Sequence, residues 1–220
     1  ESFAIFERYK STFNFPLHIH SLYELNYIEG ARGARRIVGD HTSEIDDLEL
    51  VLITGPKLEH AWVNHNCTSR NIYEVTIQMN EDLFSGGLFR KRQFSLIQHM
   101  IERANYGLAF SRETILDVQP IIRDLLNSTD QFNSMLIFLR LMQRLAQDEH
   151  AEVLSHQMFS EGMFVYDSRR VKLVMEYLEK HYNEHITLKD VAALVNMSTS
   201  SFSRFIKIRT GRNFIDCLND

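Results

Sequence analysis

The pattern of apolar and polar positions changes character along this 220-residue chain. Up to about Met79 it consists of short runs rich in β-branched and aromatic residues, separated by glycines, which is typical of strands joined by tight turns. The clearest runs cover residues 22–28, 34–39, 48–54 and 70–79. Residues 1–80 are therefore predicted to form a sandwich or a small barrel.

From about Glu81 the apolar residues recur with the period of an α-helix. Helices are expected near residues 88–105, 112–127 and 131–149. Pro120 should kink the second of these helices or reset its start. We interpret residues 81–149 as a helical segment for coupling or dimerisation, and residues 150–167, which show no clear period, as a linker.

The third of these helices has an unusually broad apolar surface. Its apolar residues are Met135, Leu136, Phe138, Leu139, Met142, Leu145 and Ala146. They cover more than one side of the helix, which is more than packing on the β zone alone requires. Part of this surface is either a subunit interface or additional core between the helices and the strands.

The last segment, residues 168–220, carries the most informative pattern of the chain, from Ile186 to Gly211. Thr187 and Asp190 have the spacing of a capping box, in which two side chains satisfy the free amides at a helix start. This spacing predicts a helix that begins at Leu188.

A second helix is expected after a break of a few residues. Asn196 tolerates a left-handed backbone and can end the first helix, and Ser198 is a good N-cap for the next. The inner side of the second helix carries Phe202, Phe205 and Ile206, and its outer side carries Ser200, Ser203, Arg204 and Lys207. Hydroxyl groups can reach base edges, and cations can pair with guanine or phosphate, so the outer side suits a major groove. An ordinary amphipathic hairpin is the alternative interpretation.

Charge favours the DNA-reading interpretation. Residues 168–220 contain nine Lys or Arg against six Asp or Glu, whereas residues 1–167 contain 15 against 23. No Asp or Glu occurs between Val191 and Ile215. A basic segment within an acidic chain points to nucleic-acid contact, although a solvated helix face produces the same pattern.

These residues also carry a family resemblance. The matching positions are Ile186, Thr187, Leu188, Val191, Ala192, Met197, Ser198, Phe202, Ser203, Arg204, Phe205, Lys207, Thr210 and Gly211. They resemble the first helix-turn-helix of AraC-type transcription regulators. A helix expected over residues 169–182 resembles the one that opens the DNA-binding domain of that family, and residues 213–220 resemble the start of its connecting helix. Because the family's second helix-turn-helix is not in this sequence, we expect a truncated DNA-binding domain.

The β zone resembles the two motifs of the cupin superfamily. The first motif is matched by His18, His20, Glu24 and Gly30, and the second by Gly55, Pro56, His60 and Asn64. In the second motif, Pro56 and His60 are one residue closer than usual, and the glycine expected between them is replaced. The resemblance implies a cupin β-barrel, which is a double-stranded β-helix. His18, His20 and Glu24 are separated by even numbers of residues, so a regular strand would point all three side chains into the barrel.

The cupin-like residues suggest two kinds of chemistry. One possibility is a metal site formed by three imidazoles and a carboxylate, from His18, His20, Glu24 and His60. This ligand set suits Zn, Fe, Ni or Mn. Alternatively the same residues are hydrogen-bonded walls of a pocket that requires no cofactor. In cupins joined to AraC-type readers the barrel generally senses an effector, which favours a sugar or another small polar ligand.

Other side chains extend the expected effector pocket. Trp62 could stack on the ligand while His60 and Asn64 form hydrogen bonds to it, and ordinary core packing is the alternative role for Trp62. Arg36 and Tyr73 are weaker candidates for the pocket.

Composition limits the class of protein. With 44% apolar and 24% charged residues the chain is typical of a globular protein. No apolar run approaches the roughly 18–20 residues that span a bilayer, and the sequence shows no signal peptide. Cys67 and Cys217 lie far apart in different predicted domains, which argues against a disulfide framework and favours the cytoplasm.

The sequence therefore predicts an α+β protein: a cupin β-barrel followed by helices, then an all-α helix-turn-helix subdomain. The expected function is a ligand-responsive transcription regulator rather than an enzyme. It should be a homodimer that binds double-stranded DNA and a small-molecule effector, without contact with a membrane. The alternative is a metal-dependent cupin enzyme, an oxygenase or isomerase, which leaves the basic C-terminal segment unexplained.

Overall fold

The computed structural model describes residues 2–13, 15–156, 170, 173–174, 177–178, 181, 186–210 and 213–215. The strands are β1 (Phe3–Lys10), β2 (Tyr23–Glu29), β3 (Arg35–Val38), β4 (His41–Glu44), β5 (Leu48–Ile53), β6 (His60–Val63), β7 (Ile72–Met79), β8 (Leu108–Ala109) and β9 (Glu152–Val153). The helices are α1 (Asp82–Ser85), α2 (Ser95–Arg103), α3 (Arg112–Asn127), α4 (Gln131–Leu145), α6 (Leu188–Leu194) and α7 (Thr199–Thr210), with 3-10 turns at Arg92–Phe94 and Ala104–Tyr106. The fold is of the α+β class.

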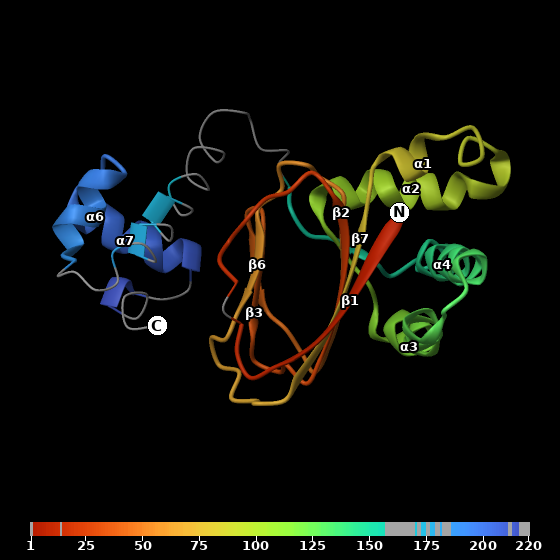
Figure 1. Cartoon of the computed structure of the whole chain (residues 1–220), viewed down its shortest axis with the longest axis horizontal. Helices are drawn as coiled ribbons and strands as arrows, with labels where there is room; N and C mark the ends of the chain where they lie inside the picture. Colours follow the sequence, from red (N-terminus) through yellow and green to blue (C-terminus); the bar gives the residue numbers. More distant parts are fainter. Residues whose placement is uncertain are drawn as a thin grey trace.

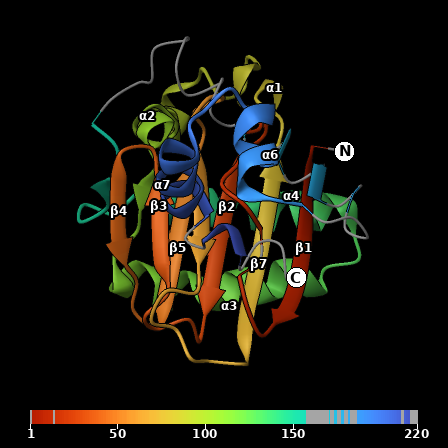
Figure 2. The same ribbon diagram turned by 90° about the vertical axis from the view of Figure 1, so that its left-hand side faces the viewer.

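Two antiparallel sheets face each other (Figure 1). The larger has the strand order β1-β7-β2-β5-β8-β9 and the smaller the order β4-β3-β6, with β1 and β4 on opposite sides of the molecule in Figure 2. Among the described strands no ladder joins the two sheets, so they form an open sandwich instead of the closed barrel that we expected. The four-residue strands of the smaller sheet pair only with one another, apart from a single bridge between His18 and His60.

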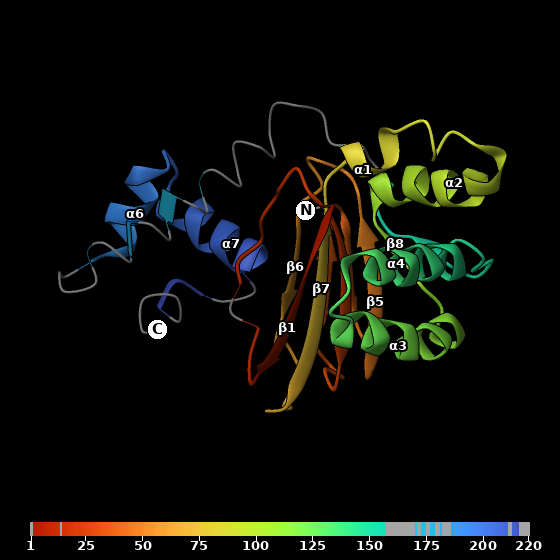
Figure 3. The same cartoon turned by 45° about the vertical axis from the view of Figure 1, so that its right-hand side comes forward.

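Side chains along the strands of the larger sheet alternate between two environments. Helices α2, α3 and α4 cover its outer face (Figure 3), where Leu25, Leu52 and Ile77 belong to one buried cluster with helix residues. The inner face looks toward the smaller sheet and carries polar residues such as Glu24 and Thr76. This two-residue period places the apolar core under the helices and leaves polar groups between the sheets.

The space between the sheets also has an apolar part. It contains Ile28, Val38, Val51, Ile53, Trp62, Ile72 and Leu154, all buried in one cluster. The interior is therefore divided between an apolar cluster and a group of buried polar side chains. These polar side chains must find partners within the sandwich because water does not reach them freely.

The helical segment largely matches its prediction. Helix α3 begins after Ser111, whose hydroxyl accepts a hydrogen bond from the Thr114 amide at 3.2 Å, and it ends at the expected residue. Pro120 lies inside α3 and does not reset its start. A proline lacks the N–H that would bind the Leu116 carbonyl, and both residues lie at the exposed surface of the helix. Helices α2 and α4 are shorter than predicted.

Two short strands occur where the sequence predicted none. β8 lies inside the expected helical segment and β9 inside the expected linker, and both join the larger sheet through β5. Each has two residues, which is too short to show a period in the sequence. After α4 the chain thus returns to the sheet before it continues.

The C-terminal helices form a separate cluster. Its buried residues are Val174, Leu178, Ile186, Val191, Ala192, Val195, Phe202, Phe205, Ile206 and Phe214. The Thr187 capping box is present, Asn196 has a left-handed φ of 54°, and the Ser201 amide donates to the Ser198 hydroxyl at 3.2 Å. These contacts confirm the predicted helix boundaries. Gly211, most of the helix expected over residues 169–182 and most of residues 213–220 lie outside the described residues.

None of the described helices has both the length and the apolar content needed to cross a membrane.

We expect Phe138→Ala to lower the free energy of unfolding by about 3–5 kcal/mol, because the substitution leaves a cavity in the core. Phe138 is fully buried and stacks on Phe3 with ring centroids 4.6 Å apart. Urea unfolding followed by the fluorescence of Trp62, the single tryptophan, measures the change. Phe132→Ala on the same helix is the control: Phe132 is 73% exposed, so its loss should cost under about 0.5 kcal/mol. Equal effects of the two substitutions would contradict this description of the core.

Candidate functional site

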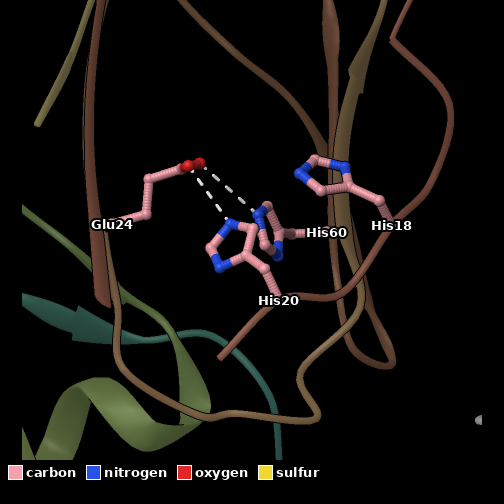
Figure 4. A group of neighbouring side chains, drawn as sticks. All are labelled: His18, His20, Glu24 and His60. Atoms are coloured by element: carbon pink, nitrogen blue, oxygen red, sulfur yellow. Dashed lines mark ion pairs between the residues drawn. The ribbon is translucent and has the colours of Figure 1, made fainter. Parts of the chain in front are cut away.

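Three histidines and a glutamate meet between the two sheets (Figure 4). His18 and His20 come from the loop before β2, Glu24 from β2 and His60 from the start of β6. One potential ligand atom of each lies within 4.8 Å of those of the others. The backbones of His18 and His60 exchange two hydrogen bonds of 3.2 and 3.0 Å, which fix the loop against β6. The four residues singled out from the sequence are therefore brought together.

The backbone sets the tautomer of all three histidines. Nδ1 of His18, His20 and His60 lies 3.0, 2.8 and 2.9 Å from the carbonyl oxygens of Pro16, Leu22 and Leu58. A carbonyl can only accept, so each Nδ1 carries a proton and donates it. The Nε2 atom of each neutral ring is then left with a lone pair, the arrangement that second-shell hydrogen bonds give to metal-binding histidines.

The Glu24 carboxylate is held from both sides. It accepts hydrogen bonds from the amides of Asn26 at 2.6 Å and Gln78 at 2.9 Å. On the opposite side its oxygens lie 3.1 Å from Nε2 of His20 and 3.5 Å from Nε2 of His60. A lone pair facing a carboxylate is repelled, so this group needs a proton or another cation between its members.

Burial and charge move the pKa values of this group in opposite directions. Burial, together with the neighbouring His60, lowers the pKa of His18 to about 3. For His20, burial is outweighed by the hydrogen bond and charge of Glu24, which raise its pKa. Burial also opposes the ionisation of Glu24, yet hydrogen bonds from His20 and His60 hold its pKa well below the usual range. Glu24 is thus held as an anion, and its charge favours the protonated form of His20.

The other expected pocket residues have different positions. Trp62 is buried in the interior, with its ring centroid 6.3 Å from that of His60. Asn64 accepts a hydrogen bond from the Phe13 amide at 2.8 Å and so fixes the N-terminal loop. Tyr73 lies on the outer face of the larger sheet, away from the histidines. Trp62 alone of these three extends the interior site.

A buried ion pair is the main feature that sequence reasoning missed. Arg36 on β3 donates to Glu49 on the facing strand β5 at 2.6 Å, and both residues are less than a tenth exposed. Arg36 is the cross-strand neighbour of Trp62. The available signal was a single carboxylate within the apolar run of residues 48–54. The Arg36 Nε has no acceptor among the described residues.

The candidate DNA-binding residues share one face of α7. Ser200, Ser203, Arg204 and Lys207 are all exposed, whereas Phe202, Phe205 and Ile206 are buried against α6 and its neighbours. The side chain of Ser200 contacts the Ser198 hydroxyl at 3.2 Å, at the start of the helix. The helix therefore presents short polar groups followed by two cations along one accessible side.

No family model matches the sequence, and no curated protein matches it. Among solved structures, ToxT from Vibrio cholerae is 13% identical, covers 100% of this chain and 98% of its own, and gives a TM-score of 0.40. ToxT of V. cholerae strain SCE256 bound to an unsaturated fatty acid is 12% identical, with coverages of 98% and 94% and a TM-score of 0.42. The AraC-like transcriptional activator CuxR is 8% identical, with coverages of 99% and 74% and a TM-score of 0.44. At these scores the functional assignment depends on the chain's own residues.

We expect Arg36→Met to lower the free energy of unfolding by about 3–5 kcal/mol at neutral pH, because it leaves the buried Glu49 carboxylate without its cationic partner. Burial already raises the pKa of Glu49, and the loss of Arg36 removes the charge that opposes this shift. The pKa of a glutamate in the unfolded chain is about 4.3. If its pKa is higher in the folded state, the stability of the fold falls as the pH rises above that value. The loss of unfolding free energy caused by Arg36→Met should therefore become smaller as the pH falls toward 4.

Urea unfolding between pH 4 and 8 tests this. Adding Glu49→Gln to Arg36→Met should recover most of the lost stability. Arg32→Met is the matched control, because the Arg32–Asp46 pair lies at the surface with side chains 72% and 57% exposed. A pH-independent loss in Arg36→Met would contradict the assigned role of Glu49.

Proposed function

We propose that this chain is a ligand-responsive, DNA-binding transcription regulator of the AraC type. The observation that carries the proposal is the exposed face of α7, where Ser200, Ser203, Arg204 and Lys207 stand opposite a buried apolar stripe. The second helix of a helix-turn-helix lies in the major groove and reads base edges with such side chains. The absence of acidic residues from Val191 to Ile215 in the sequence favours the approach of a phosphate backbone.

The sandwich is proposed as a cupin-like sensor. A small polar effector, such as a sugar, would contact the polar group of His18, His20, Glu24 and His60 and the ring of Trp62. The effector must bind one arrangement of the protein more tightly than the other, because equal affinity would shift no population. A homodimer acting on DNA in the cytoplasm completes the proposal. Exposed apolar residues on the helices, among them Leu116, Phe132 and Leu136, are candidates for its interface.

We also propose that the histidine cluster accepts a divalent cation such as Zn, Fe, Ni or Mn. The donor set fits, because three Nε2 lone pairs and a carboxylate converge and each Nδ1–H is already bound by a backbone carbonyl. When bound, the ion would supply a positive charge that balances Glu24 and attracts an oxygen of a ligand. This donor set is the one observation that favours a metal-dependent enzyme as a second candidate function. An enzyme would leave the exposed cations of α7 without a role.

We expect Arg204→Ala to weaken the binding of full-length protein to DNA by about 1–3 kcal/mol and to relax the preference at one base pair. The target duplexes are selected from a random-sequence pool with the native chain, and affinity is measured by fluorescence anisotropy at several salt concentrations. A uniform loss over all duplexes would assign Arg204 to a phosphate contact. Arg112→Ala, an exposed arginine on α3, is the control. Unchanged affinity in Arg204→Ala, or no selected duplex, would contradict the proposed function.

We expect the chelator-treated native chain to bind one equivalent of Zn²⁺ or Mn²⁺, and His60→Ala to bind it at least about tenfold more weakly. Metal titration followed by elemental analysis of the protein fraction measures this. His99→Ala, which removes an exposed histidine from α2, should bind like the native chain. The metal proposal fails if the native chain binds no ion or if both variants bind equally. A metal-loaded chain that turns over a small substrate and binds no DNA would favour the enzyme.

A further inference from the structure

A cavity of about 620 Å³ lies on the outer face of the larger sheet, beside α3. Strands β1, β2 and β7 form its floor, and α3 forms a wall. It lies on the opposite side of the sheet from the histidine cluster, and it has no part in the function proposed above. Its volume is within the range of sites that bind small molecules.

Three carboxylates line this cavity, from Glu7, Glu29 and Asp47. Glu7 accepts a hydrogen bond from the Tyr73 hydroxyl at 2.7 Å, and Glu29 accepts one from the Tyr27 hydroxyl at 2.9 Å. Burial and the Glu29 hydrogen bond raise the pKa of Tyr27 to about 12, so this phenol stays a donor. These bonds fix two of the carboxylates and leave lone pairs on each for a ligand.

Tyrosine rings form an aromatic wall beside the carboxylates. The ring centroids of Tyr9 and Tyr73 are 4.9 Å apart, and Tyr9 is 71% exposed, so its ring is accessible from the cavity side. An ammonium group is attracted to the face of a tyrosine ring and to carboxylates at the same time. This part of the cavity therefore suits an organic amine.

A single cation lines the other side of the cavity. Arg123 projects from α3, and among the described residues it makes no ion pair with the three carboxylates. Its guanidinium can pair with a carboxylate in the bidentate manner. The cavity thus carries three negative charges on the sheet side and one positive charge on the helix side.

We propose that this cavity binds a free basic amino acid such as lysine or arginine. The ammonium or guanidinium groups of the ligand would contact Glu7, Glu29 and Asp47, and its α-carboxylate would contact Arg123. A basic amino acid has two positive charges and one negative charge, which complements the charges of the cavity in sign. A simple diamine would leave Arg123 without a partner, and a neutral amino acid would leave part of the negative side unmatched.

Three probes of matched size test the proposal on the full-length chain by calorimetric titration. Lysine has all the charged groups, 1,5-diaminopentane lacks the carboxylate, and norleucine lacks the side-chain ammonium. Lysine should bind at least about tenfold more tightly than either of the others. Tight binding of the diamine alone, or no binding of lysine at millimolar concentration, would overturn the proposal.

Two variants test the two sides of the cavity separately. Arg123→Ala should weaken lysine binding by about tenfold and leave the diamine unaffected, because only lysine has a carboxylate. Asp47→Asn should weaken the binding of both lysine and the diamine. The substitution removes no side-chain hydrogen bond among the described residues, because the Asp47 side chain makes none there. Arg112→Ala on the same helix is the control. If neither variant changes lysine binding, lysine binds elsewhere and the proposal is wrong. This result is independent of whether the chain binds DNA.

Discussion

The buried charge of Glu24 is the constraint around which the sandwich is organised. A carboxylate removed from water is stable only when its oxygens have partners, and here these partners come from different parts of the fold. Asn26 and Gln78 belong to the larger sheet, His20 to the N-terminal loop and His60 to the smaller sheet. The same contacts that satisfy this charge hold the two sheets at a fixed separation. The stability of the sandwich and the geometry of the site therefore have one physical origin.

Buried polar groups between the sheets are tolerated because the larger apolar cluster lies on the other face of the larger sheet. The outer face of the larger sheet and helices α2, α3 and α4 bury a large cluster that includes Leu25, Ile77 and Phe138. Each such side chain contributes about 1.5–3 kcal/mol when it is fully buried. The helices thus supply the hydrophobic stabilisation that a sandwich usually takes from between its sheets. The space between the sheets can then hold the charged groups of Glu24, Arg36 and Glu49, whose burial is unfavourable without partners.

The features that sequence reasoning predicted well are local ones. The Thr187 cap, the left-handed Asn196 and the apolar stripe of α7 depend on neighbours a few residues away, so their spacing is sufficient. The histidine cluster is a long-range contact, and a family resemblance rather than the residue pattern brought His60 to it. The even spacing of His18, His20 and Glu24 assumed one regular strand, but His18 and His20 lie in the loop before β2 and only Glu24 lies in the strand. Spacing along a strand also cannot relate one strand to another. Tyr73 pairs with Glu29 on the outer face, a register that only the folded sheet defines.

The segment that leaves the sandwich shows how an interior ligand could influence the C-terminal helices. Leu154 is buried in the same cluster as Trp62 and Val38, and the Ser155 hydroxyl donates to Asp40 at 2.7 Å in the turn between β3 and β4. The exit of the chain is therefore packed against the residues that a ligand beside Trp62 would displace. A regulator needs two arrangements that a ligand distinguishes by contact. In this chain the residues beside Trp62 and the start of the connection to the C-terminal helices belong to one packed group, which is the kind of contact that the proposed function requires.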